Sequence, residues 1–361
     1  MRQRTVIPFG PQHPVFPEPL QLKLHLEEER VIEAIPVLGY VHRGLEKLAE
    51  QKDFVQNVFL IERLCGICSF MHALCYCQGI ESLIGLQVPD RARFLRTIWA
   101  ELARLHSHHL WLGLLADALG FESLFMQVFR NREIIMDVIE ATTGGRMIFC
   151  SCLIGGVRRD IPNDLLKETI ARLDQAEKLL DQIAPVILAE YTVKERTANL
   201  GIVTKEQARK LGAVGPVARA SGIAMDMRTL GYAAYGDLDF APIVEEAGDC
   251  YARIVVRVKE MYQSFDLIKQ AAKRMPKGEH ALPIKRLLPD GETVVRVEQP
   301  RGELMYYIRA NGSKKLERVR VRTPTYANIP PLLHMLTGAQ LANVAAVAVL
   351  SIDPCISCVE R

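Results

Sequence analysis

Two Cys-x-x-Cys pairs near opposite ends of the chain are the strongest chemical signal in the sequence. The first pair is Cys65 and Cys68, and the second is Cys355 and Cys358, with only three residues after it. Each pair can place two thiolates on one metal, and thiolates are soft ligands that suit zinc, iron–sulfur clusters, copper(I) and nickel. We therefore expect a fold that brings the last turn of the chain back to an early helix.

A structural zinc site with four cysteine ligands is the plainest interpretation of the two pairs. Structural zinc pairs usually lie close together in sequence, whereas residues 69–354 separate these two. Each pair is also flanked by side chains that could do chemistry, Arg63 and His72 around the first and Asp353 before the second. A chain of 361 residues is long enough to fold without zinc. Zinc and a redox metal centre remain as alternatives at this point.

Composition favours a large soluble subunit over a nucleic-acid-binding or membrane-spanning protein. Apolar residues make up 49% of the chain and the mean hydropathy is +0.07, which is enough for a large core. The net charge is only +3, and no basic block suggests nucleic acid. The apolar run Leu341–Ile352 is too short to cross a bilayer, and the first residues do not resemble a signal peptide. Nine cysteines, an odd number, favour free or metal-bound thiols over disulfides.

We expect an α+β fold, mainly a bundle of long antiparallel helices with small N-terminal and C-terminal β elements. Alternating residues 20–26 and 31–35 predict a hairpin after a proline-rich, extended start. Helical periodicity marks three segments, residues 90–119, 164–183 and 240–272. Strand patterns mark three more, residues 292–297, 303–310 and 315–321, with a hairpin turn at Asn311-Gly312. Because the cysteine pairs must meet, we expect one interlocked domain over residues 1–361.

The residues around both pairs resemble the signature motifs of nickel–iron hydrogenase large subunits. Residues 63–72 read R-L-C-G-I-C-S-F-M-H, which fits the family motif R-x-C-G-x-C-x-x-x-H. Residues 353–358 read D-P-C-I-S-C, which fits D-P-C-x-x-C. The resemblance covers essentially the whole chain. It looks closest to the energy-converting, membrane-bound branch, which includes the Ech-type and carbon-monoxide-induced hydrogenases.

That branch is related to the quinone-site subunit of respiratory complex I, and parts of this chain resemble that subunit as well. The resemblance is carried by four segments, residues 10–14, 42–46, 215–222 and 248–251. His13, in the first of them, resembles the quinone-site histidine. The complex I subunit lacks the four metal cysteines that are present here, so the resemblance favours hydrogen chemistry over quinone chemistry.

By this resemblance, all four cysteines hold nickel through their thiolates. Cys68 and Cys358 also bridge to iron, which in the family carries carbon monoxide and cyanide, whereas Cys65 and Cys355 are terminal ligands. Metal binding keeps the thiolates deprotonated. Cys355 is expected to accept the proton when hydrogen is cleaved.

The resemblance implies roles for residues outside the cysteine pairs. Glu18 lies where the family places its proton-gate glutamate, and a carboxyl group shielded from water can exchange protons near neutral pH. Arg301 lies in E-Q-P-R-G-E, where relatives often have E-A-P-R-G, and matches the arginine that binds cyanide beside the open metal position. Asp353 is expected to contact Arg301 or to cap the cysteine turn, and His72 to hydrogen-bond a cysteine sulfur. The structural alternatives are a solvated glutamate, a surface arginine and a plain buried histidine.

Glu46 matches a glutamate that in many relatives binds magnesium or iron near the C-terminus. The partner in those relatives is a C-terminal histidine, but the corresponding residue here is Arg361, which cannot serve as a metal ligand. Two alternatives follow. Either a magnesium ion or a second iron ion binds at Glu46, or an ion pair between Glu46 and Arg361 replaces the metal.

Other cysteines and histidines carry no matching motif. Free buried cysteine is common in proteins, so we assign packing roles to five residues, Cys75, Cys77, Cys150, Cys152 and Cys250. The histidines His106, His108 and His109 lack a carboxylate pattern that would complete a metal site. Asp117 matches, within one residue of register, a further aspartate that the family places near the metal.

The resemblance implies the catalytic subunit of a membrane-associated hydrogenase that interconverts hydrogen with protons and electrons. Reduced ferredoxin is the expected electron partner, and coupling to ion translocation is expected. The implied partners are an iron–sulfur small subunit, ferredoxin-like electron-transfer subunits, integral membrane ion-translocating subunits and maturation factors. The expected location is peripheral, on the cytoplasmic face of the cell membrane. The alternatives are the hydrogenase subunit of a formate hydrogenlyase and a non-catalytic four-cysteine zinc scaffold.

Overall fold

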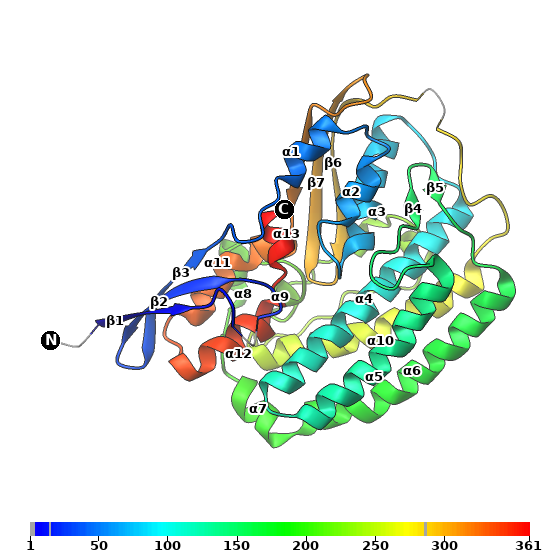
Figure 1. The fold of residues 1–361 in the computed structure, drawn as a ribbon. Helices are drawn as coiled ribbons and strands as arrows, with labels where there is room; N and C mark the ends of the chain where they lie inside the picture. Colours follow the sequence, from blue (N-terminus) through cyan, green and yellow to red (C-terminus); the bar gives the residue numbers. More distant parts are fainter. Residues whose placement is uncertain (1–3, 14–15, 285–286) are drawn as a thin grey trace.

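The computed structural model describes residues 4–13, 16–284 and 287–361, with the side chains of all of these except residues 345, 346 and 348–350. Pro14, at the end of the 10–14 segment, lies outside the described residues. Figure 1 shows a bundle of long helices, a tall β-sheet and an N-terminal sheet that projects from one side, with the C-terminal helices between them.

Four long helices form the bundle, α4 (Asp90–Ala118), α5 (Glu122–Thr143), α6 (Asn163–Ala189) and α10 (Cys250–Arg274). Helix α4 is the central one, because it packs against both α5 and α10 and is buried along most of its length. Helix α6 buries residues only at three- and four-residue intervals, as expected of a helix with one face in water. The helices predicted at 90–119 and 164–183 are thereby confirmed.

The third predicted helix begins later than the sequence pattern suggested. The Asp249 side chain accepts a hydrogen bond from the Ala252 N–H group at 2.7 Å, and this N-cap fixes the start of α10 at Cys250. Residues 240–249 contain no regular helix. The expectation was therefore wrong for this stretch and correct for the remainder.

A second layer is the antiparallel sheet of β6 (Asp290–Gln299), β7 (Gly302–Asn311) and β8 (Arg318–Arg322), in that order. The three strands predicted near the C-terminal end are thus confirmed, and Gly312 begins the connection between β7 and β8. Helix α3 (Ser69–Leu83) packs on this sheet. The contact is close, since a Cβ atom on Gly79 would lie only 2.7 Å from Ile308 and 2.8 Å from Val295.

The β6–β7 hairpin brings its tip to the helix bundle. Gln299 pairs with Gly302, which leaves Pro300 and Arg301 as the two tip residues. Arg104 of α4 donates hydrogen bonds to the carbonyl oxygens of Glu298 at 2.8 Å and Gln299 at 3.4 Å. The sheet therefore delivers Arg301 to the interior of the molecule.

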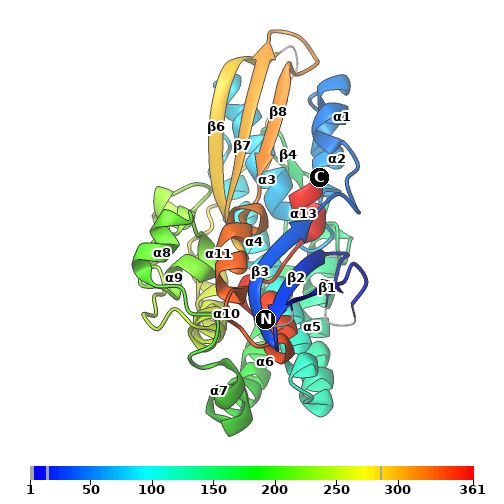
Figure 2. The ribbon, with the colours of Figure 1, turned by 90° about the vertical axis from the view of Figure 1, so that its left-hand side faces the viewer.

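The N-terminal sheet consists of β1 (Arg4–Phe9), β2 (Gln21–Glu27) and β3 (Arg30–Val37), also antiparallel. Alternate leucines of β2 are buried, and β3 contacts α11 (Pro324–Leu336). Figure 2 shows this sheet in front of the C-terminal helices. The predicted β2–β3 hairpin is confirmed. The first part of the extended start pairs with β2 as a strand, which the sequence did not predict.

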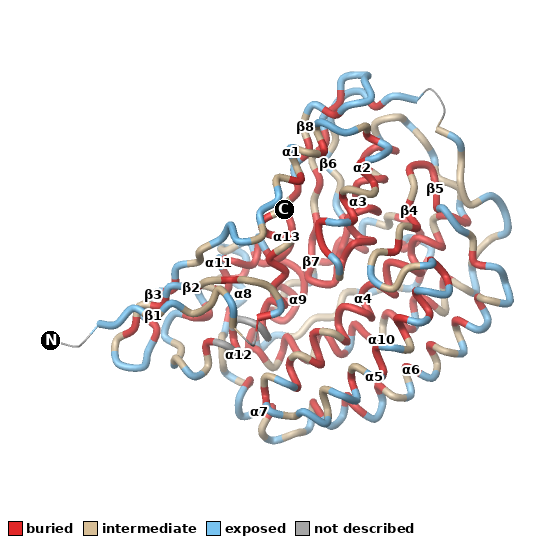
Figure 3. The backbone as a smooth tube through the Cα atoms, viewed as in Figure 1, coloured by how far each residue is buried: buried red, intermediate tan, exposed pale blue. Residues whose placement is uncertain are grey.

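The remaining elements are short, namely α1 (Leu45–Gln51), α2 (Asn57–Glu62), β4 (Cys152–Leu153), β5 (Gly156–Val157), α7 (Tyr191–Thr197), α8 (Lys205–Lys210), α9 (Gly215–Arg219), η1 (Met227–Leu230), η2 (Tyr235–Asp237), α12 (Leu341–Ile352) and α13 (Ile356–Glu360). Helix α13 packs on α11 and is mostly buried (Figure 3). The expected α+β class with a long-helix bundle is confirmed. Over the described ranges, no helix combines the length and the apolar character needed to span a membrane.

Candidate metal centre

The first cysteine pair lies at the N-terminus of α3. Cys68 is the N-cap residue of this helix, and Cys65 precedes it in a short loop. The backbone N–H groups of Ile67 and Cys68 both donate to Cys65 Sγ at 3.3 Å. Both cysteines are buried. Donors from a loop and a helix N-terminus thus point at a buried sulfur, which favours a thiolate.

The second pair lies where α12 is followed by α13. Asp353 has a positive φ of 50°, which turns the chain ahead of Cys355, the N-cap residue of α13. The Cys355 N–H group donates to Thr325 Oγ1 at 3.2 Å, and Thr323 Oγ1 donates to the Cys358 carbonyl at 3.0 Å. Both threonines belong to the start of α11. Helix α11 therefore anchors the second pair.

The fold brings the two pairs together. The ligand atoms of the four cysteines lie within 4.8 Å of one another, and all four residues are buried. The short contacts cross between pairs, with Cys68 Sγ at 3.4 Å from Cys358 Sγ and Cys65 Sγ at 3.3 Å from Cys355 Sγ. A tetrahedral ion with metal–sulfur bonds of about 2.3 Å has sulfurs about 3.8 Å apart, so this arrangement suits one bound ion. The crosswise contacts also match the expected bridging pair and terminal pair.

The protonation states of these thiols depend on one another. Burial raises the pKa of Cys68, but hydrogen bonds with the thiols of Cys355, Cys358 and Cys65 bring that pKa well below its ordinary value. Burial and the same kind of contacts hold the pKa of Cys358 well above its ordinary value. One thiolate is therefore stabilised by thiols that keep their protons. Ionising all of them requires a cation in their midst, which fits a metal site.

Arg301 reaches this cluster from the tip of the β6–β7 hairpin. Its Nη2 donates to Asp353 Oδ1 at 2.9 Å, its Nε to the Asp353 carbonyl at 2.6 Å, and its Nη1 to Ser107 Oγ at 3.2 Å. Arg301 is 3% exposed and Asp353 4%. Burial opposes the charge, but Asp353 and the nearby thiolates of Cys355 and Cys68 hold the pKa of Arg301 well above its ordinary value. The predicted contact between Arg301 and Asp353 is confirmed.

Glu18 is held by a residue inside the second cysteine motif. The Ser357 N–H group donates to Glu18 Oε2 at 2.8 Å, and Ser357 Oγ donates to Glu18 Oε1. On its other side Glu18 lines a surface cavity of about 420 Å³, together with His13 and Phe16. Glu18 thus lies between this cavity and the second cysteine pair. Its role as a proton gate stays a prediction.

His72 links α3 to the second pair. Its Nε2 lies 3.4 Å from Cys358 Sγ, and its Nδ1 lies 2.8 Å from the hydroxyl of Tyr306. The histidine is fully buried. The predicted hydrogen bond to a cysteine sulfur is confirmed, although the sulfur belongs to the other pair and not to the preceding Cys68.

Glu46 is paired with arginine. Arg361 Nε donates to Glu46 Oε1 at 2.8 Å, Arg320 Nη1 donates to Oε2 at 2.7 Å, and the Val321 N–H group donates to Oε1 at 2.9 Å. Burial raises the pKa of Glu46, but these donors outweigh it and lower the pKa. The ion pair between Glu46 and Arg361 is confirmed. A magnesium or iron ion would have to displace a guanidinium, so we keep the ion-pair interpretation.

Glu360, which the sequence did not single out, ties down the same chain end. Its Oε1 accepts from the Gly39 N–H group at 2.6 Å, its Oε2 accepts from Val41 N–H, and its carbonyl contacts His42 Nδ1. The last two residues are thereby joined to the segment around α1. The tail of the chain is closed over the second cysteine pair.

The remaining candidates lie away from the cluster or within packing contacts. Asp117 is exposed on the last turn of α4, so its expected place near the metal is wrong. The three histidines bond within the bundle, His106 to Arg132, His108 to Glu260 and His109 to a backbone carbonyl. Within the described ranges, the four motif cysteines are the one group of His, Cys, Asp or Glu side chains placed to hold an ion.

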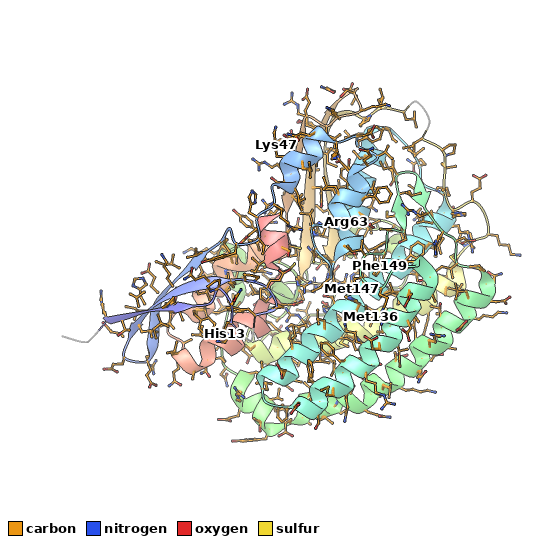
Figure 4. The ribbon with its side chains drawn as sticks, in the orientation of Figure 1. His13, Lys47, Arg63, Met136, Met147 and Phe149 are labelled. Atoms are coloured by element: carbon orange, nitrogen blue, oxygen red, sulfur yellow. The ribbon has the colours of Figure 1, made fainter. Side chains whose placement is uncertain are left out.

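Sequence reasoning also missed a loop beside the first pair. Ser69 Oγ donates to the Met147 carbonyl at 3.0 Å. Figure 4 shows Met147 and Phe149 of this loop near Arg63, at the end of α2. Ser107, Thr325 and this loop contact the site from segments that carry no motif. Only Ser357 had a signal, which is its position between two motif cysteines.

Two family models match the chain. The model described as Respiratory-chain NADH dehydrogenase, 49 Kd subunit, matches residues 118–289 and 284–361. The model described as Nickel-dependent hydrogenase matches residues 43–121. Each cysteine pair therefore lies in a different match, the first pair in the hydrogenase model and the second in the 49 Kd model.

Individual relatives are similar over nearly the whole chain. Carbon monoxide-induced hydrogenase of Rhodospirillum rubrum is 40% identical over 98% of this chain and 99% of its own. Membrane-bound hydrogenase subunit alpha of Pyrococcus furiosus is 38% identical over 98% of this chain and 87% of its own. Among solved structures, a chain of the archaeal membrane-bound sulfane sulfur reductase superposes with a TM-score of 0.94 at 32% identity, over 99% of this chain and 98% of that one. The chain belongs to the nickel–iron hydrogenase large-subunit family, in the energy-converting, membrane-bound branch that is related to the 49 Kd subunit of the respiratory NADH dehydrogenase.

Proposed function

We propose that the chain is the catalytic subunit of a membrane-associated nickel–iron hydrogenase, which interconverts hydrogen with protons and electrons. The observation that carries the proposal is the convergence of four buried cysteine sulfurs, from both ends of the chain, on one ion-sized site. The family contains members with other printed activities, such as NADH-quinone oxidoreductase, so family membership alone does not decide the reaction.

Four thiolates would hold nickel, and those of Cys68 and Cys358 would be shared with an iron that carries carbonyl and cyanide. When bound, this centre supplies a redox-active metal pair at which the bond in hydrogen is cleaved or formed. Cys355 Sγ takes the proton that leaves, and the carboxylate of Glu18 receives it from the side of the second pair. Ser357 fixes that carboxylate through two hydrogen bonds. The cavity beside Glu18 then gives the proton a way to water.

Arg301 and His72 serve the site without taking the proton. The guanidinium of Arg301 stabilises negative charge that builds up in the cluster and offers donors to cyanide. Asp353 positions that guanidinium through two of its hydrogen bonds. His72 Nε2 faces the sulfur of Cys358 and adjusts its electron density.

The same surroundings argue against a zinc scaffold. A structural zinc site needs four thiolates and closed packing, and it gains nothing from a buried arginine at its edge. Burying Arg301 costs free energy that only its partners offset. A functional reason for that charge is the simpler account.

Electron delivery requires partner subunits. We infer an iron–sulfur small subunit near the nickel, ferredoxin-like electron-transfer subunits with reduced ferredoxin as donor, and integral membrane subunits that translocate ions. Maturation factors would insert the metals, and the subunit would lie on the cytoplasmic face of the cell membrane. The names of two relatives, membrane-bound hydrogenase and formate hydrogenlyase, support a membrane-associated complex. Neighbouring genes distinguish formate hydrogenlyase from a ferredoxin-linked enzyme.

Metal analysis of the purified protein tests the proposal. We expect nickel and iron in the wild type and no nickel in Cys65→Ser. Cys75→Ser is the matched control, because Cys75 is equally buried on α3 but bonds only to backbone carbonyls. Zinc without nickel in the wild type would contradict the proposal and support the scaffold.

A further inference from the structure

A second set of charged side chains lies inside the bundle, behind the β6–β7 hairpin tip. We call it the buried charge cluster, and it consists of Glu101, Arg104, Arg219, Asp226, Arg228, Glu260 and Glu298. Each of these residues is at most 1% exposed. They come from α4, α9, η1, α10 and β6 and from the residue before η1. Charges so deep in a protein must be balanced, because the cost of removing an unpaired charge from water is large.

Arg219 is the hub of the cluster. Its Nε donates to Glu260 Oε1 at 2.9 Å, and its Nη1 donates to Glu298 Oε1 at 2.6 Å. Asp226 Oδ2 also lies 3.3 Å from Arg219 Nη1. One guanidinium is therefore shared by three carboxylates. The second oxygen of Glu298 accepts only a backbone N–H group, that of Met227, at 3.0 Å.

The other two arginines are already engaged with other carboxylates. Arg228 pairs with Asp226 at 2.9 Å and with Glu101 at 3.3 Å. Arg104 pairs with Glu101 at 3.2 Å and gives its Nη2 to the backbone carbonyl of Glu298. Among the residues that the structure describes, this cluster thus sets three guanidiniums against four carboxylates. It is one positive charge short of balance.

Two groups are placed to take the proton that restores balance, His108 and Glu298. His108 Nε2 lies 3.0 Å from Glu260 Oε2, but burial lowers the pKa of His108 to about 4 despite that carboxylate. Burial and the nearby charge of Asp226 raise the pKa of Glu298 to about 7, against the opposing effect of Arg219. The histidine is therefore neutral near pH 7, and the carboxyl of Glu298 is the better place for the proton.

Water can reach the neighbourhood of Glu298. The hydroxyl of Tyr232 accepts a hydrogen bond from the Glu298 N–H group at 3.0 Å. Tyr232 also lines a surface cavity of about 540 Å³, together with Gln78 and Arg296. One residue thus separates the cluster from solvent. The charged and titratable groups around Glu298 are Arg219, Asp226, Arg104, Arg228, Glu260, Glu101, Tyr232 and Tyr235.

We propose that the buried charge cluster holds one exchangeable proton on the carboxyl of Glu298, and that this proton sets the net charge behind Arg301. A line of alternating charges joins the two places. Arg257 is attracted by Asp353, the partner of Arg301, and by Glu260, the partner of Arg219. The proton on Glu298 does not depend on the proposed hydrogenase function, and only its link to the metal centre rests on it.

Infrared spectroscopy of the full chain, titrated with acid and base, tests the proposal without metal or hydrogen turnover. A protonated carboxyl has a carbonyl stretch separate from the amide band and from carboxylates. We expect such a band in the wild type that disappears as the pH rises through about 7. It should be absent at every pH in Glu298→Gln and unchanged in Glu292→Gln, an exposed glutamate on the same strand.

Two further variants make the test decisive. Glu260→Gln removes one carboxylate from the cluster, so three guanidiniums face three carboxylates and the band should be lost at a lower pH than in the wild type. If Glu298→Gln does not fold, this shift carries the test. Burial also raises the pKa of Glu62 to about 7, so Glu62→Gln is the necessary comparison. A band that survives in Glu298→Gln but is lost in Glu62→Gln would overturn the proposal, as would an unshifted titration in Glu260→Gln.

Discussion

The pairing of Arg301 with Asp353 allows a charged hairpin tip to lie in the protein interior. Both side chains are almost fully buried, and removing one partner of such a pair costs about 3–5 kcal/mol because the other charge is left unpaired. The family motifs predicted both residues. The hydroxyl of Ser107, which completes the arrangement, comes from a helix segment without any motif. Sequence alone could not place it there, because only the packing of α4 against the hairpin does so.

Glu18 is the residue on which proton transfer is expected to depend. We expect Glu18→Gln to lower hydrogen turnover by about 10²-fold or more, since a positioned acid–base group contributes on that scale. Glutamine keeps the size of the side chain and an acceptor for the Ser357 N–H group, but it cannot take up a proton. Turnover and nickel per chain should be measured on the same preparation, and nickel should stay at the wild-type value.

Glu33→Gln is the control for this variant, because Glu33 is an exposed glutamate on β3. Both measurements should match the wild type. Loss of nickel in Glu18→Gln would show that the carboxylate is structural. Undiminished turnover would remove Glu18 from the proton route.

At the scale of elements, periodicity predicted the long helices and the C-terminal sheet, but not their exact starts or all their partners. The start of α10 depends on one side chain, Asp249, which caps it. Strand β1 forms in a proline-containing segment only because β2 offers a partner. Such boundaries are decided by local caps and by tertiary pairing, which a periodic pattern does not contain.

Gly215 is the point where α9 meets the backbone of the hairpin tip. Its φ is +64°, and an added Cβ atom would lie 2.3 Å from the Arg301 carbonyl oxygen and 2.4 Å from Gly302 Cα. Gly212 has a similar φ of +69° but nothing within 4 Å. Gly212→Ala should lower the free energy of unfolding by about 1–2 kcal/mol through backbone strain alone. Gly215→Ala should lower it by roughly 1–3 kcal/mol more, because backbone must move.

Urea unfolding of the two variants measures the difference. Gly215→Ala should also lose hydrogen turnover beyond what its stability explains, since the displaced backbone belongs to Arg301. Equal destabilisation of the two variants would show that the hairpin tip moves freely and is not fixed by α9.

The C-terminal ion pair predicts a stability that does not depend on a divalent metal. Glu46 is paired with Arg361 and Arg320, so magnesium and chelators should leave the thermal midpoint of the wild type unchanged. Arg361→His introduces the residue that many relatives carry, and magnesium or ferrous iron should then raise the midpoint by binding the folded state. A rise with metal in the wild type would mean that a metal displaces Arg361.

At the scale of the whole molecule, the metal site is assembled from parts that are distant in sequence. The first pair begins α3, Arg301 comes from the β6–β7 hairpin, and the second pair comes from the last turn of the chain. The separation of the two motifs predicted that the ends must meet. It could not predict the closure, in which Glu360 and Arg361 join the tail to α1 and the segment before it. A tail held by hydrogen bonds and ion pairs can close after a metal has been inserted.

The most direct test of the central claim is an infrared spectrum of the purified complex in the region of metal-bound carbonyl and cyanide. The account predicts sharp bands from one carbonyl type and from cyanide, present in the wild type and in Cys75→Ser and absent in Cys68→Ser. These bands arise only if iron with those ligands is bound at the four-cysteine cluster. A wild-type complex that contains its full metal complement and shows no such bands would contradict the hydrogenase assignment.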